Sequence, residues 1–268
     1  MKPYVKAIIF LILLIILDFL FRKGFFAFII PVPVLPNIIM FFLFLLFAIC
    51  SWLVTRWFCR SDNIGLNDIG VSWSKANRFE FFIGFIVGAG LWALVSLVQA
   101  FTADFSWNLR ADPTLFNLLY GLIFIFIADL GTELFYRGYP LTKFKDSFGY
   151  TMAIVIMVLF VGLKSFSFEV EGELLLYSMI IPALHTLFFS IIYFKTKRIG
   201  ACLGIHTGAN FITISVFDLR IEQPHQAIPA GIYEPSIDVN SLSLTALQLP
   251  WIIVATVLSA AVYYWWRY

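Results

Sequence analysis

The stretch that decides the fold is Asp129-Leu-Gly-Thr-Glu133-Leu-Phe-Tyr-Arg137-Gly-Tyr-Pro140, at the end of a long apolar run. Residues 113–127, which precede it, carry no formal charge and read as membrane-buried. On one helix Asp129, Glu133 and Arg137 lie along a single stripe, because they are spaced by four residues. A charge inside a membrane needs a partner or a function, so we expect Glu133 and Arg137 to form an ion pair.

The composition is that of an integral membrane protein. Of its 268 residues, 61% are hydrophobic and 13% charged, whereas soluble domains carry about 25% charged residues. The net charge of +2 is too small to suggest nucleic acid as a partner. The three cysteines show no CxxC spacing and read as packing residues, so neither a metal nor another cofactor is expected.

The apolar runs predict an all-α, polytopic transmembrane helical bundle of about eight spans. No repeat or linker divides the chain, so we expect a single integral membrane domain over residues 1–268. Basic residues gather in every second loop, which places both the N- and the C-terminus in the cytoplasm. The predicted spans are roughly 4–21, 38–58, 81–101, 113–137, 150–163, 174–194, 199–217 and 248–266.

The fourth span is framed by typical helix signals. Asp112 followed by Pro113 predicts its start, and Gly138 with Pro140 predicts its end. A helix over 113–137 is long enough to cross a tilted bilayer.

Three polar residues in other apolar runs also need an explanation. Lys164 ends an apolar run and, taken alone, reads as a side chain that extends to the membrane interface. Asp18 requires a polar partner that the sequence does not identify. His185 is better explained by a hydrogen bond to a neighbouring helix than by metal binding, because no further ligands lie near it in the sequence.

A last polar pair follows a basic turn near residue 198. His206 and Asn210 are four residues apart and share a helical face, with Gly204 and Gly208 alongside to let another helix approach closely. By themselves these two residues can be an interhelical hydrogen-bond pair that only stabilises the bundle.

Taken together, these stretches resemble the CAAX-processing and bacteriocin-processing (CPBP, or Abi) intramembrane endopeptidases. The motifs of that family are E-E-x-x-x-R followed by Gly, F-x-x-x-H and H-x-x-x-N. The resemblance covers residues 80–217 and implies a CAAX-protease-like core there. In the same order, the motifs stand here as Thr132-Glu133-Leu-Phe-Tyr-Arg137-Gly138, Phe160-Val-Gly-Leu-Lys164 and His206-Thr-Gly-Ala-Asn210.

The departures from the family pattern bear on activity. The resemblance assigns water activation to the positions of Thr132 and Lys164, where the family has glutamate and histidine. By resemblance, Glu133 and Arg137 support the site, while His206 and Asn210 stabilise the oxyanion. The half of the site that makes the nucleophile is therefore replaced.

Two other arrangements that would allow hydrolysis remain open. Thr132 and Lys164 can in principle act as nucleophile and base, as in Ser-Lys hydrolases. Asp129, one helical turn before Thr132, can supply a carboxylate, although it is displaced by about 4.5 Å along the axis.

The sequence therefore allows three functions. The first is a catalytically degenerate pseudoprotease that binds a membrane protein or peptide, possibly lipidated, as a scaffold or regulator. The second is an active glutamic-type endopeptidase with a variant catalytic group at Lys164, Thr132 or Asp129. The third is a small proton-coupled transporter with the intramembrane ionisable residues along its path, although no repeat symmetry supports it.

Overall fold

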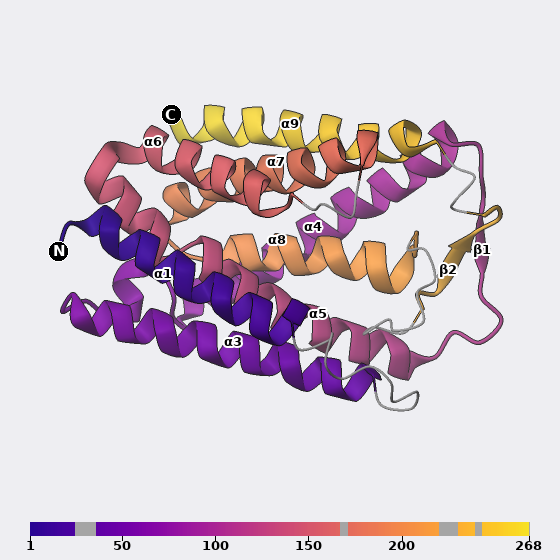
Figure 1. Cartoon of the computed structure of the whole chain (residues 1–268). Coiled ribbons are helices and arrows are strands. Elements are labelled where there is room, and N and C mark those ends of the chain that lie inside the picture. Colours follow the sequence, from indigo (N-terminus) through magenta and orange to yellow (C-terminus); the bar gives the residue numbers. More distant parts are fainter. Residues whose placement is uncertain (25–35, 167–170, 220–229, 239–242, 268) are drawn as a thin grey trace.

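Eight α-helices make up most of the part of the chain that the computed structural model describes, namely residues 1–24, 36–166, 171–219, 230–238 and 243–267 (Figure 1). An all-α bundle is therefore confirmed. The helices are α1 (Pro3–Asp18), α3 (Pro36–Ser61), α4 (Lys75–Thr102), α5 (Leu115–Tyr136), α6 (Tyr139–Lys164), α7 (Gly172–Thr196), α8 (Gly200–Asn210) and α9 (Leu244–Arg267).

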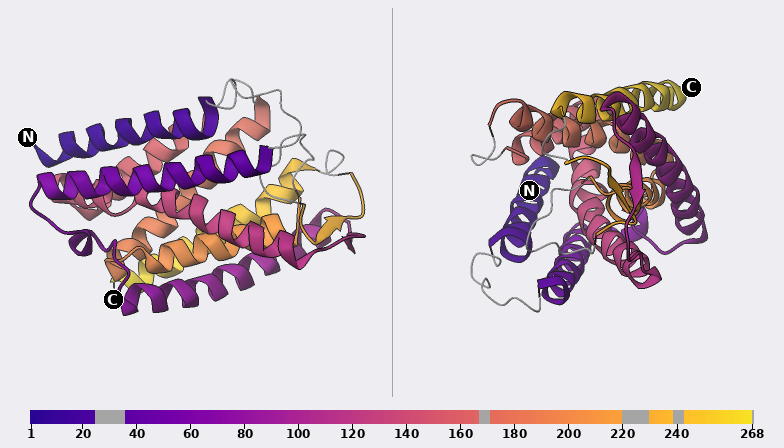
Figure 2. Two further views of the ribbon diagram at one scale, coloured as in Figure 1. Left: turned by 90° about the horizontal axis from the view of Figure 1, so that it is seen from below. Right: turned by 90° about the vertical axis from the view of Figure 1, so that its right-hand side faces the viewer.

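The helices lie side by side along one direction, and the two chain ends are at the same end of the bundle (Figure 1). The further views in Figure 2 agree, with α3 and α9 on opposite sides. At the other end, β1 (Trp107–Leu109) and β2 (Tyr233–Pro235) pair as an antiparallel ribbon. Termini at a common end are what the predicted even number of spans requires, while their cytoplasmic location stays a prediction.

The number of spans is close to the eight predicted. Within the described residues, six stretches are long and apolar enough to cross a membrane. One of them, Leu115–Lys164, is 50 residues long and contains both α5 and α6. The predicted span 199–217 is the 11-residue α8 followed by a π-helical segment, Phe211–Val216. The predicted span 150–163 is the second part of α6, which kinks at Gly149, where φ is 80°.

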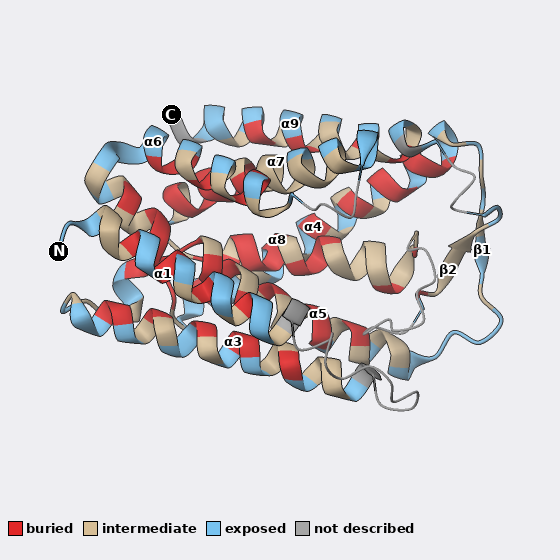
Figure 3. Ribbon diagram, in the orientation of Figure 1, coloured by how far each residue is buried: buried red, intermediate tan, exposed pale blue. Residues whose placement is uncertain are grey.

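The distribution of side chains is that of a protein surrounded by lipid. Large apolar side chains such as Phe101 and Phe116 are exposed, whereas the charged residues Glu133 and Arg137 lie in the interior. Figure 3 shows the buried residues mainly on the faces that the helices turn toward one another. These charged side chains therefore lie inside the bundle, where burying a charge is energetically unfavourable unless the charge is paired.

Glycines bring α4 and α8 into backbone contact. A Cβ atom on Gly204 of α8 would lie 2.1 Å from the carbonyl oxygen of Phe81, and one on Gly88 of α4 would lie 2.3 Å from that of Ile205. Such contacts leave no room for a side chain. The expectation that Gly204 admits a neighbouring helix is confirmed, and the neighbour is α4.

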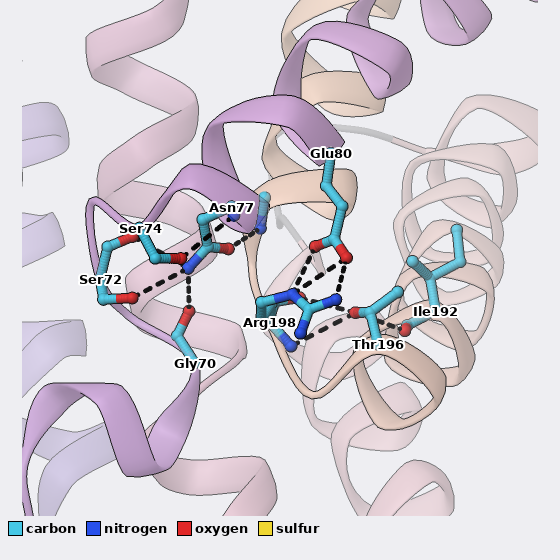
Figure 4. A network of polar contacts seen from close by, with 9 residues as sticks. Gly70, Ser72, Ser74, Asn77, Glu80, Ile192, Thr196 and Arg198 are labelled. Carbon is cyan, nitrogen blue, oxygen red and sulfur yellow. Dashed lines mark hydrogen bonds and ion pairs between the residues drawn. The ribbon is translucent and has the colours of Figure 1, made fainter.

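The start of α8 is fixed to the start of α4 by polar contacts (Figure 4). The Asn77 side chain donates from Nδ2 to the Gly70 carbonyl at 3.0 Å and accepts from the Gly200 amide at 2.9 Å. Arg198 forms an ion pair with Glu80 of α4. Because the first amides of a helix lack intrahelical acceptors, the contact to Gly200 satisfies one of them and fixes the register of α8.

A carboxylate after α3 joins three segments at the end of the bundle where the termini lie. Asp62 forms an ion pair with Lys6 of α1, another with Lys143 of α6 at 2.5 Å, and accepts a hydrogen bond from the Tyr139 hydroxyl at 3.0 Å. Burial raises the pKa of Asp62, but the hydrogen bonds from Lys143, Lys6 and Tyr139 outweigh it and lower the pKa from the ordinary 3.8.

The backbone contact between α4 and α8 predicts that Gly88→Ala is destabilising. Because its Cβ would overlap the Ile205 backbone, we expect the free energy of unfolding to fall by about 1–3 kcal/mol, the usual effect of overpacking. Thermal unfolding in detergent measures this. The control is Gly90→Ala in the same helix, whose Cβ meets nothing within 4 Å; equal losses in both variants would contradict the packing argument.

The lowered pKa of Asp62 predicts a pH-dependent stability. A carboxylate with a folded-state pKa below its unfolded value stabilises the fold above the unfolded pKa, and this stabilisation is lost as the pH falls through the folded pKa. We expect Asp62→Asn to melt at a lower temperature than the wild type near neutral pH, and the two melting temperatures to converge as the pH falls through the lowered folded-state pKa, below 3.8. Melting curves from neutral to acid pH test it, with the exposed Asp112→Asn as control. A gap that persists in acid would contradict the prediction.

Candidate functional site

Helix α5 carries the polar stretch and ends where the sequence predicts. It covers Leu115–Tyr136, and Gly138, with φ of 68°, turns the chain into α6. A positive φ is a conformation that glycine adopts without a steric penalty. The predicted start at Asp112 is wrong by two residues, because the N-cap is Thr114, whose hydroxyl accepts the Asn117 amide at 3.1 Å.

The stripe predicted on α5 is buried and paired. Glu133 is 0% exposed, and its Oε1 lies 3.3 Å from an Arg137 guanidinium nitrogen, so the expected ion pair is confirmed. The Arg137 guanidinium also lies over the Phe189 ring of α7, 5.1 Å from its centroid. Arg137 is thus held inside the bundle and is not a residue of the basic membrane interface.

Helix α8 places the last motif against this stripe. His206 Nδ1 is 2.8 Å from Glu133 Oε1, and Asn210 donates from Nδ2 to Asp129 Oδ1 at 2.8 Å. His206 Nε2 lies 3.5 Å from the same Asp129 oxygen. Asp129 and Glu133 of α5 therefore face Asn210 and His206 of α8. The His206 imidazole lies between the two carboxylates.

Asp129 thereby contacts the groups to which the resemblance assigns oxyanion stabilisation. Its Oδ1 accepts the Asn210 hydrogen bond and lies 3.5 Å from His206 Nε2. Sequence spacing placed Asp129 on the same stripe as Glu133, but it did not indicate this contact with α8.

Lys164 is the last residue of α6, and it points into the bundle. Its ammonium lies 2.7 Å from Asp18 Oδ2 of α1 and 3.3 Å from the Tyr136 hydroxyl of α5. The expectation that this side chain extends to the interface is therefore wrong, because a buried carboxylate attracts it. The same contact identifies a partner for Asp18, which the sequence did not reveal.

Thr132 has a local partner. Its hydroxyl donates to the Ala128 carbonyl at 2.9 Å, one turn earlier on α5. Thr132 and Lys164, both in the described part of the chain, make no hydrogen bond with each other.

A cavity of about 500 Å³ lies between α3, α5, α6, α7 and α8. Glu133 is fully buried and does not line the cavity. It contacts Arg137 and His206, which do. Apolar side chains such as Phe124 and Phe189 form much of the remaining wall. The predicted site residues that line it are Asp129, Thr132, Arg137, Lys164, His206 and Asn210.

His185 also lines this cavity, together with Asp129, Lys164 and His206, with which the transporter alternative grouped it. Its ring packs against Trp92 of α4 and Trp251 of α9, at centroid distances of 5.8 and 5.9 Å. The expected hydrogen bond to a neighbouring helix is not found, because Nε2 is buried without a partner among the described residues. Its position as an ionisable residue inside an apolar helix was the available signal.

The described residues contain no group of three or more His, Cys, Asp or Glu side chains placed to hold a metal ion. That no metal or cofactor takes part stays a prediction.

The apolar exterior and the helical bundle define a multi-pass integral membrane protein with a polar interior cavity. Residues 112–212 match the family model described as type II CAAX prenyl endopeptidase Rce1-like. This segment contains all three motifs, so the resemblance predicted from them is confirmed. No curated protein sequence matches the chain.

The buried pair predicts a large effect of unbalancing its charge. Glu133→Gln leaves the Arg137 guanidinium inside the bundle without its carboxylate, and we expect a loss of about 3–5 kcal/mol in the free energy of unfolding. Unfolding by SDS titration measures it. The control is Glu133→Met with Arg137→Met, which removes both charges and should cost less than the single change; a larger loss in the double variant would contradict a charge imbalance as the cause.

Proposed function

We propose that this CAAX-protease-like membrane protein binds a peptide segment of a membrane partner in its interior cavity without cleaving it. In this role it would act as a scaffold or regulator. Three features of the cavity support binding over hydrolysis.

The first feature is the half of the site that would activate water. A threonine hydroxyl is not a base near neutral pH, and general-base assistance is typically worth about 10²–10⁴-fold in rate. Lys164 is engaged in an ion pair with the Asp18 carboxylate at a distance of 2.7 Å. Neither replacement residue is thus arranged to generate a nucleophile.

The second feature, which carries the proposal, is the position of Asp129. Asn210 already donates to Asp129 Oδ1, and His206 Nε2 lies 3.5 Å from that atom. An oxyanion formed between these donors would meet a carboxylate in its place. Since each oxyanion donor is typically worth about 10²–10³-fold in rate, engaging both of them with Asp129 works against catalysis.

The third feature is the cavity itself. Its volume of about 500 Å³ lies in the range of about 300–1,000 Å³ that is usual for ligand sites. Its lining combines apolar side chains such as Phe124 and Phe189 with polar groups, among them Thr132 and Asn210, that can orient a ligand. The cavity therefore has room for a ligand, although the two residues expected to activate water are replaced.

An endopeptidase with a variant catalytic group is the alternative that a specific contact favours. His206 lies between the carboxylates of Glu133 and Asp129, and a carboxylate that orients a histidine is a common arrangement for general-base catalysis. In this reading Asp129 would be the variant group, in preference to Lys164, which is engaged with Asp18.

The two readings differ in what happens to peptide mass. We expect purified protein in detergent to retain a subset of a membrane-peptide library with every mass unchanged, as read by mass spectrometry. Thr132→Trp, which fills the cavity, should reduce retention about tenfold or more, since tenfold corresponds to only about 1.4 kcal/mol.

The matched control is Ile123→Trp, which places the same tryptophan side chain on α5 at a position that is 53% exposed. It should retain peptide like the wild type. Cleavage products from the wild type that disappear in Asp129→Asn would overturn the proposal in favour of the alternative. Equal retention by both tryptophan variants would place binding outside the cavity.

A further inference from the structure

A second cavity, of about 320 Å³, lies between α4, α7, the π-helical segment Phe211–Val216 and α9. Among the described residues that line it, none carries a charge, and the polar ones are two amides and two hydroxyls. Ile214 lies in the walls of both cavities, so the second cavity is a neighbour of the interior one. The polar residues that line the second cavity, Ser96, Gln99, Thr213 and Gln248, do not line the interior cavity.

The two hydroxyl side chains in this lining have their hydrogens committed and their acceptor capacity free. Ser96 donates to the Trp92 carbonyl and Thr213 to the Ala209 carbonyl, each four residues earlier and each at 3.0 Å. A hydroxyl oxygen has two lone pairs in addition to its one hydrogen. Both side chains can therefore still accept a hydrogen bond from a ligand.

Gln99 adds a third acceptor, and this one has no donor. The side chain is 2% exposed, and its Nε2 donates to the Leu247 carbonyl of α9 at 2.6 Å. This contact fixes the orientation of the amide, because a carbonyl oxygen can only accept. Gln99 Oε1 is then buried without a partner among the described residues. Because an unsatisfied buried acceptor is unfavourable, a ligand that donates a hydrogen bond to it would be stabilised.

The cavity lies near the ends of two membrane spans. The α4 span ends at Thr102 and the α9 span begins at Thr245, so Gln99 and Gln248 are each about 4.5 Å from a span end. Ser96 is also close to the β-ribbon, since its carbonyl accepts a hydrogen bond from Trp107 Nε1 at 3.2 Å. The polar part of the cavity is therefore at the depth where lipid headgroups meet the hydrocarbon core.

Two walls of the cavity are helices that also face lipid. Leu97 and Val98 of α4 are exposed, although their neighbours Ser96 and Gln99 line the cavity. On α9, Leu249 is exposed in the same way beside Gln248. The lipid phase is thus one helix away from the cavity and is the nearest source of a ligand.

We propose that this second cavity binds a neutral lipid whose headgroup carries free hydroxyls, such as a monoacylglycerol. A charged headgroup would be buried there without a counter-charge, which is unfavourable. A hydroxyl both donates and accepts, so it suits the acceptor of Gln99 and the amide hydrogens of Gln248. Apolar lining residues such as Ile181 and Trp251 lie farther from their span ends and would contact the acyl chain. The proposal is independent of peptide binding in the interior cavity.

Two amphiphiles that differ only in their hydrogen-bond donors test the proposal. The full-length protein is placed in phosphatidylcholine nanodiscs, whose headgroups have no hydroxyl, and titrated with radiolabelled dodecylglycerol or with the same molecule methylated on both hydroxyls. The wild type should bind the free diol about tenfold more tightly, a ratio that corresponds to about 1.4 kcal/mol. Equal affinities would overturn the proposal, because methylation removes the donors and keeps the chain.

Substitutions in the lining place the binding in this cavity. Gln99→Met should bring the two affinities together, and the nearly isosteric Thr213→Val should lower the affinity for the diol about threefold, the usual effect of one hydrogen bond. The matched control is Thr102→Val. Its hydroxyl also donates to an α9 carbonyl, that of Ala246 at 3.2 Å, but it does not line the cavity. This variant should keep the full preference for the diol.

The remaining outcomes are equally decisive. An equal loss in Thr102→Val and Thr213→Val would trace the effect to the packing of α9 and overturn the site. If Gln99→Met fails to fold, the wild-type comparison and Thr213→Val still decide. Displacement of the diol by a short hydrophobic peptide amide, but not by unlabelled monoacylglycerol, would assign the cavity to peptide and overturn the lipid. Tighter binding of dodecyl glucoside than of dodecylglycerol would support the hydroxyl headgroup and identify a glycolipid as its source.

Discussion

The contact between Glu133, Arg137 and His206 is the constraint that organises the interior of this protein. A carboxylate that is fully buried in a membrane bundle is tolerated when cations and hydrogen-bond donors surround it. Glu133 has Arg137 on its own helix and His206 on α8. Because the second contact crosses between helices, it fixes the rotation of α8 about its axis and brings Asn210 against Asp129.

The position of α8 depends in turn on packing that carries no charge. Glycines on α4 and α8 let the two backbones touch, and the amide contact from Asn77 sets the start of α8. Van der Waals packing of this kind drives helix association in lipid, where apolar burial gives little advantage. The position of α8 beside the polar cavity therefore depends on small residues that let α4 and α8 pack closely.

Two segments that matter for the cavity lie outside the part that resembles CAAX proteases. Helix α1, before residue 112, supplies Asp18, the partner of Lys164. Helix α9 supplies Trp251, which packs on His185. Lys164, which stands where the family has a histidine, thus has a counter-charge from a helix beyond the matched segment.

The sequence by itself determined the membrane class, the helices and the stripe on α5, because hydropathy and four-residue spacing are local properties of the chain. It also determined the four-residue pairing of Glu133 with Arg137 and the close approach at Gly204. Only the tertiary structure decided that Lys164 meets Asp18, that Asp129 meets Asn210 and that His185 lines the cavity. Those contacts join helices far apart in the chain, and their geometry depends on how each helix is rotated and shifted against its neighbours.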